Sequence, residues 1–188
     1  MQKIDFNAPT FNGFNTGEDL LVDTCILLAL MSESDPWHQT VSQLFFEHIF
    51  PVDKIVLLYT NSLIVNEIMH LSTRSLKDYF NRMQITHNTT LLKTQEDFTR
   101  DMMKTFINEE VLKVRDGDQD SAFQQIELTS RLGAADAANT SIANLYGLNF
   151  LTVDNKLVHN MYSCSSELNN IKKVYYTHPR HIVHYGFE

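Results

Sequence analysis

Four carboxylates stand at positions from which the chain could bring them together for chemistry. Asp23 and Asp154 each directly follow a short apolar run, Asp136 opens a helical segment that leads into the second of these runs, and Glu67 lies in the helix that follows another run. Like charges at short range destabilise each other, and a divalent cation removes that cost. Oxygen-only ligands favour Mg²⁺ or Mn²⁺, and such ions activate water and stabilise a leaving oxygen. The expected chemistry is phosphodiester hydrolysis.

Each of these acids also has a simpler interpretation when it is taken alone. An aspartate after a strand commonly caps a helix or forms a turn. Asp136 could complement the positive end of a helix, and Glu67 could be solvated. The functional interpretation therefore depends on the four residues together.

The elements that must position these acids alternate along the chain. Apolar runs predict strands at 20–22, 55–59, 111–114, 148–153 and 171–176. Apolar spacing and capping residues predict helices at 24–31, 36–50, 63–78, 119–132 and 134–146, with a less regular helical region over 79–110. Alternation of this kind predicts an α/β fold, a three-layer α/β/α sandwich with a central parallel sheet of about five strands. The carboxyl ends of parallel strands meet at the edge where ligands bind, so the acids should converge there.

One nuclease-like domain is expected over residues 20–188, with an expanded helical region at about 75–110. Residues 1–19 show little periodicity and are predicted to form an irregular N-terminal arm. Three phenylalanines, Phe6, Phe11 and Phe14, are expected to pin this arm to the surface.

Four segments of the chain resemble PIN-domain ribonucleases. They are Leu21-Val22-Asp23-Thr24, Thr60-Asn61-Ser62-Leu63-Ile64-Val65-Asn66-Glu67-Ile68, Ala135-Asp136-Ala137-Ala138 and Leu151-Thr152-Val153-Asp154. The order Asp, Glu, Asp, Asp is that of the family, and so is the short distance between the last two acids. The resemblance covers residues 20–180.

The resemblance implies a three-layer sandwich and Mg²⁺- or Mn²⁺-dependent cleavage of single-stranded RNA. It makes four acids the catalytic and metal-binding set: Asp23, Glu67, Asp136 and Asp154. Thr24 and Thr152 match positions where the family often has a small hydroxyl beside an acid. Many members are toxins of bacterial toxin–antitoxin pairs and form homodimers, which makes an antitoxin and a second copy the expected protein partners. The long N-terminal arm, the expanded helical region and Lys156, where some members carry a further acid, depart from an ordinary toxin.

Composition and charge limit the function classes. The chain has 188 residues, 43% hydrophobic and 20% charged, which is typical of a globular protein. The sequence shows no apolar run long enough for a membrane span and no signal peptide, and its two cysteines are too few for a disulfide framework, so a cytoplasmic protein without membrane contact is expected. Cys25 lies in an apolar helix and is expected to be buried and inert.

The net charge of −8 argues against binding of duplex DNA by bulk positive charge. Basic residues gather near the C-terminus, and four of them are candidates for contact with RNA: Lys156, Lys172, Lys173 and Arg180. Two alternatives stay open. A non-catalytic RNA- or protein-binding module on the same fold would show no metal-dependent cleavage. A small-molecule phosphatase, the less favoured one, would act on simple phosphoesters.

Overall fold

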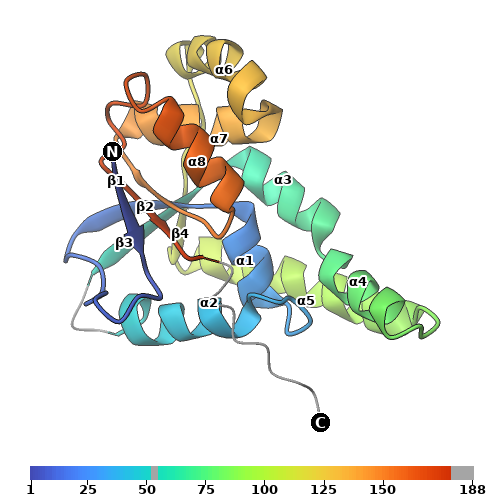
Figure 1. Cartoon of the computed structure of the whole chain (residues 1–188). Coiled ribbons are helices and arrows are strands. Elements are labelled where there is room, and N and C mark those ends of the chain that lie inside the picture. Colours follow the sequence, from blue (N-terminus) through green and yellow to red (C-terminus); the bar gives the residue numbers. More distant parts are fainter. Residues whose placement is uncertain (52–54, 179–188) are drawn as a thin grey trace.

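The structure is a computed structural model and describes residues 1–51 and 55–178. Its centre is one sheet of six parallel strands in the order β1-β6-β5-β2-β3-β4, flanked by helices (Figure 1). The strands are β1 Gln2–Asp5, β2 Glu18–Val22, β3 Val56–Thr60, β4 Leu112–Val114, β5 Asn149–Leu151 and β6 Lys173–Tyr176. The predicted α/β class with a parallel sheet is confirmed.

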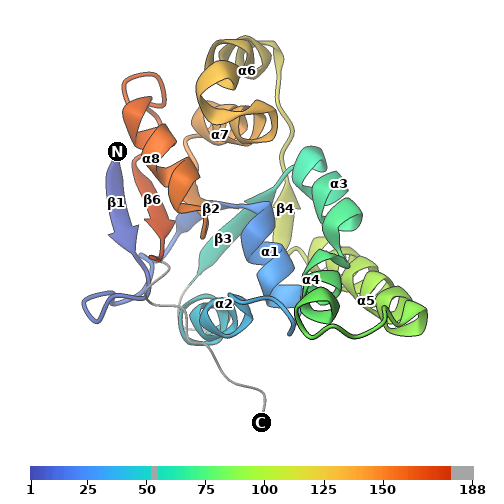
Figure 2. The ribbon, with the colours of Figure 1, turned by 45° about the vertical axis from the view of Figure 1, so that its right-hand side comes forward.

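The helices fill the connections between the strands. They are α1 Thr24–Met31, α2 His38–Leu44 with the π-helix η1 Phe45–Ile49, α3 Ser62–Leu71, α4 Arg74–Arg82, α5 Thr89–Asn108, α6 Gln119–Leu132, α7 Ala134–Tyr146 and α8 Asn155–Ser163. Helices α6 and α7 pack against each other (Figure 2). Gly147 ends α7 in the left-handed conformation, at φ 66°, which favours glycine.

The direction in which successive strands are added to the sheet reverses at β2. From β2 the chain proceeds to β3 and β4 on one side, and it returns through α6 and α7 to β5 on the other side. Residues Leu20, Leu21 and Val22 of β2 are completely buried, as expected for a strand covered on both faces. The carboxyl ends of β2 and β5 therefore form a topological switch point, the place where open α/β sheets bind ligands.

The predicted irregular arm is wrong in part. Residues 2–5 form β1, which pairs in parallel with β6, and residues 18 and 19 belong to β2. The sheet therefore has six strands rather than about five. The polar sequence of β1 carries no alternating apolar pattern, because this strand lies at the edge of the sheet and is half exposed. Phe6 and Phe14 are buried, which confirms that aromatic side chains fix the segment.

One helical prediction needs a smaller correction. The helix expected over 63–78 is two helices, because α3 ends at Leu71 and α4 begins at Arg74. Helices α4 and the 20-residue α5 occupy most of residues 75–110, where a helical region was expected. Within the part of the chain that the structure describes, no helix is long and apolar enough to cross a membrane.

Candidate functional site

Asp23 lies at the end of β2 and caps α1. Its Oδ1 accepts a hydrogen bond from the Thr24 backbone N–H at 2.8 Å, and its Oδ2 accepts one from the Thr152 hydroxyl at 2.6 Å. The residue is 6% exposed. Burial raises the pKa of Asp23, and nearby Glu67 raises it further, while the hydrogen bonds from Thr152, Cys25 and Thr24 oppose this shift. The site therefore holds a buried carboxylate that is costly to ionise.

Glu67 is connected to Asp23 through Thr24, the residue that follows Asp23 in the chain. The Thr24 hydroxyl donates to Glu67 Oε2 at 2.7 Å, so one residue contacts two of the predicted acids. The position of α3, which carries Glu67, is set at its start. Asn61 caps α3 by accepting a hydrogen bond from the Ile64 N–H at 2.8 Å, and its amide donates to Asn139 of α7 at 2.9 Å in a buried contact. This amide pair ties the helix of Glu67 to the helix of Asp136.

Asp154 follows β5 and caps α8. Its Oδ1 accepts hydrogen bonds from the backbone N–H groups of Lys156 and Leu157, at 2.8 Å and 3.0 Å. Its own N–H donates to Thr152 Oγ1 at 3.0 Å, and the Thr152 hydroxyl in turn donates to Asp23. Thr152 thus links the ends of β5 and β2, as Thr24 links β2 to α3.

Asp136 lies half-buried in the first turn of α7. Its side chain makes no hydrogen bond with any residue in the described part of the chain. Burial, followed by the charges of Asp23, Asp154 and Glu67, raises the pKa of Asp136 to about 6, and Lys156 acts in the opposite direction. Asp136 therefore lies within electrostatic reach of the other three predicted acids, at the switch point of the sheet.

The donor set agrees with a hard divalent cation. The four side chains offer carboxylate oxygens only, which suits Mg²⁺ or Mn²⁺, and a cation would offset the repulsion that, after burial, contributes to the raised pKa of Asp136. As the side chains stand, no group of three or more His, Cys, Asp and Glu residues within 1–51 and 55–178 is arranged to hold a metal ion.

The predicted basic residues do not gather at this edge. Lys156 lies there, exposed at the start of α8. Lys173 begins β6, at the opposite, amino edge of the sheet, and adjacent Lys172 donates to the Asn169 carbonyl at 2.7 Å. The structure therefore separates Lys172 and Lys173 from the acids. Arg180 lies outside the described residues.

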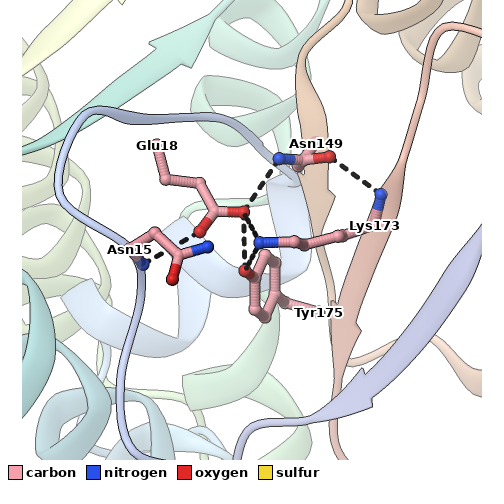
Figure 3. Close-up of polar contacts among 5 residues, drawn as sticks. All are labelled: Asn15, Glu18, Asn149, Lys173 and Tyr175. Atoms are coloured by element: carbon pink, nitrogen blue, oxygen red, sulfur yellow. Dashed lines mark hydrogen bonds and ion pairs between the residues drawn. The ribbon is translucent and has the colours of Figure 1, made fainter.

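At the amino edge, Lys173 belongs to a buried network that the sequence did not indicate (Figure 3). Glu18 is 6% exposed and accepts hydrogen bonds from Tyr175 Oη at 2.6 Å, Lys173 Nζ at 2.9 Å, Asn149 Nδ2 at 2.9 Å and the Asn15 N–H at 3.0 Å. Burial raises the pKa of Glu18, but the hydrogen bonds from Tyr175 and Lys173 outweigh it, and the pKa is lowered. This network joins β2, β5 and β6.

Cys25 is the functional-site neighbour that sequence reasoning missed. Its Sγ lies 3.1 Å from Asp23 Oδ2 and 3.3 Å from Thr152 Oγ1, and the side chain is only partly buried. Its place two residues after a strand-end aspartate was the available signal, because the first turn of a helix folds back over its capping residue.

No family model and no curated protein matches the chain in sequence. The solved structures with a similar fold include the following two. PAE2754 from Pyrobaculum aerophilum is 15% identical, with 81% of this chain and 96% of that chain covered at a TM-score of 0.47. FitAcB from Neisseria gonorrhoeae is 13% identical, with 86% of this chain and 99% of that chain covered at a TM-score of 0.46.

Proposed function

We propose that this protein is a metal-dependent endoribonuclease that hydrolyses phosphodiester bonds of single-stranded RNA. The observation that carries the proposal is the convergence of Asp23, Glu67, Asp136 and Asp154 at the switch point, where burial and then the charges of the other three acids raise the pKa of Asp136 to about 6. Proteins seldom retain such an electrostatic cost except where a functional site needs it.

The four carboxylates would hold Mg²⁺ or Mn²⁺, after side-chain rotations that bring them closer together. When bound, the ion supplies activation of water and neutralisation of charge on the phosphodiester. The chain's own contribution is orientation. Thr24 links Asp23 to Glu67, and Thr152 links Asp23 to the end of β5. Lys156 is placed to attract a phosphate group.

The ordered acids support this choice of substrate through their resemblance to PIN-domain ribonucleases. The toxin role, an antitoxin partner, a homodimer and a cytoplasmic location belong to the same resemblance and are part of the proposal. An antitoxin would be expected to place a basic side chain among the four acids, because a cation there offsets their repulsion.

A second candidate function, a non-catalytic binding module, has one observation in its favour. Asp23 and Asp154 both cap helices, so two of the four acids already have a structural role. Helix capping does not account for Asp136, whose carboxylate accepts no capping hydrogen bond and whose pKa is raised by burial and by the other three acids. The nuclease proposal explains all four positions.

The test is a substrate panel for the full chain: single-stranded RNA, duplex RNA, single-stranded DNA and a simple phosphate monoester. Each substrate is incubated with Mn²⁺, with Mg²⁺ and with a chelator. We expect cleavage of single-stranded RNA with either ion and none with the chelator. Hydrolysis of the monoester alone would support a phosphatase, and RNA binding without cleavage under any metal would support the non-catalytic module.

A further inference from the structure

Cys25 occupies the gap between the ends of β2 and β5. Its S–H donates to Asp23 Oδ2 at 3.1 Å, and its sulfur accepts the backbone N–H of Val153 at 3.4 Å. One side chain of α1 thereby contacts both the strand-end acid of β2 and the backbone that leads to Asp154.

These contacts determine which oxygen of Asp23 stays available. Oδ2 accepts two side-chain hydrogen bonds, from Cys25 and from Thr152 at 2.6 Å, whereas Oδ1 accepts only the Thr24 N–H at 2.8 Å. A carboxylate oxygen has two lone-pair directions, so the donors saturate Oδ2 and leave one direction free on Oδ1. Cys25 thus helps to fix the carboxylate in one orientation.

We propose that Cys25 is a positioning residue that holds Asp23 so that Oδ1 faces the cation. This inference rests on the proposed function, because it concerns the same four-carboxylate site. Partners that orient a metal-ligating side chain commonly contribute 10- to 100-fold to metal affinity. A thiol is a weak donor, so the lower end of that range is expected here.

The first test measures Mn²⁺ affinity by electron paramagnetic resonance in the full chain. Cys25→Ala should weaken binding about tenfold. Cys25→Ser should restore affinity close to that of the wild type, because a hydroxyl can donate to Oδ2. Cys164→Ala is the control, since it removes the other, buried cysteine without touching the site. Equal affinity of Cys25→Ala and the wild type would overturn the proposal.

A second readout needs no metal and detects the hydrogen bond itself. The infrared S–H stretching band of Cys25 is assigned by its loss in Cys25→Ala and compared between the wild type and Asp23→Asn. We expect a shift to higher wavenumber in Asp23→Asn, because a neutral amide oxygen is a weaker acceptor than a carboxylate. An unshifted band would overturn the proposal even if the nuclease activity is confirmed.

Failure of the proposed function gives a different pattern. A wild-type protein that binds no Mn²⁺ but shows the shifted S–H band would contradict the metal site. In that case the hydrogen bond from Cys25 to Asp23 exists, but both the metal site and the role of Cys25 in orienting Asp23 toward a cation are refuted.

Discussion

At the scale of single residues, Asp136 carries the clearest functional signal. The other three acids accept hydrogen bonds from neighbouring groups, whereas the Asp136 carboxylate accepts none from the described residues and faces three like charges. Its ionised form is therefore less favourable in the folded chain than in the unfolded one. Lys156 only partly offsets this cost.

This cost predicts that Asp136→Asn stabilises the metal-free protein. The folded-state pKa of about 6 lies above the ordinary value of 3.8, so ionisation of Asp136 destabilises the fold increasingly as pH rises through this interval. Each pKa unit corresponds to about 1.4 kcal/mol, and solvent screening reduces this for a half-buried group, so we expect a gain of about 1–2 kcal/mol at pH 8.

Urea unfolding at pH 8 and at pH 4 in the presence of a chelator measures this effect. The gain from Asp136→Asn should largely vanish at pH 4, where the wild-type carboxyl is protonated in the folded state. A variant that is less stable than the wild type at pH 8 would show that Asp136 has a stabilising partner and no unrelieved charge.

At the scale of elements, the two edges of the sheet serve different purposes. The carboxyl edge gathers acids that repel each other, while the amino edge joins β2, β5 and β6 through Glu18 and its four donors. The amino-edge network fixes the relative position of the two strands whose opposite ends carry Asp23 and Asp154. The hydrogen-bond network at the amino edge thus stabilises the two strands that bring the mutually repelling acids together at the carboxyl edge.

Replacement of Lys173 tests this division. Lys173→Met should destabilise the chain by about 2–3 kcal/mol, because it removes one partner of a buried ion pair and leaves Glu18 ionised in the interior. Lys172→Met is the matched control: it changes the exposed neighbour and should alter stability by less than about 0.5 kcal/mol.

Thermal unfolding at neutral pH compares the two variants, and RNA cleavage is measured well below their midpoints. Any activity that the wild type shows should persist in Lys173→Met, since Lys173 lies at the edge opposite the acids. Loss of cleavage with unchanged stability would instead assign Lys173 to RNA contact.

Local signals predicted most of the elements. The boundaries of α6 and α7 were predictable from the turn that precedes Gln119, from Gly133 between the two helices and from Gly147, which ends α7 in the left-handed conformation. Strand β1 could not be predicted, because its polar sequence becomes a strand only by pairing with β6 at the far end of the chain.

The candidate site was likewise predictable only where local sequence determines the position of a residue. The placement of Asp23 and Asp154 follows from their strands, whereas the contact of Cys25 with Val153 depends on how two distant strand ends pack. Lys173 was predicted to contact RNA because basic residues gather near the C-terminus of the sequence. The direction of β6 places it at the opposite edge, since it begins the strand.

At the scale of the whole molecule, net charge limits how the proposed nuclease would bind RNA. A net charge of −8 repels a polyanion, and within the described residues Lys156 is the cation that acts on the acid cluster. Under the proposed function, RNA binding is therefore expected to depend on the divalent ion and on few direct contacts with phosphate.

Salt dependence measures the number of those contacts. For single-stranded nucleic acid, a plot of the logarithm of the association constant against the logarithm of salt concentration has a slope of about −0.7 per phosphate contact. We expect a slope of about −1, corresponding to one or two contacts. Fluorescence anisotropy with Asp136→Asn, which should not cleave, gives this slope, and a value of about −4 would reveal an extended basic path that this account lacks.

The central claim is that the four carboxylates form a metal-dependent nuclease centre, and the cleavage rate of a single-stranded RNA tests it most directly. The rate is measured in Mn²⁺ for the wild type, for Asp136→Asn and for Asp120→Asn, a control acid in the first turn of α6. We predict that Asp136→Asn lowers the rate at least 100-fold, on the order expected for loss of a metal ligand, while Asp120→Asn leaves it unchanged. Cleavage at the wild-type rate by Asp136→Asn would contradict the claim.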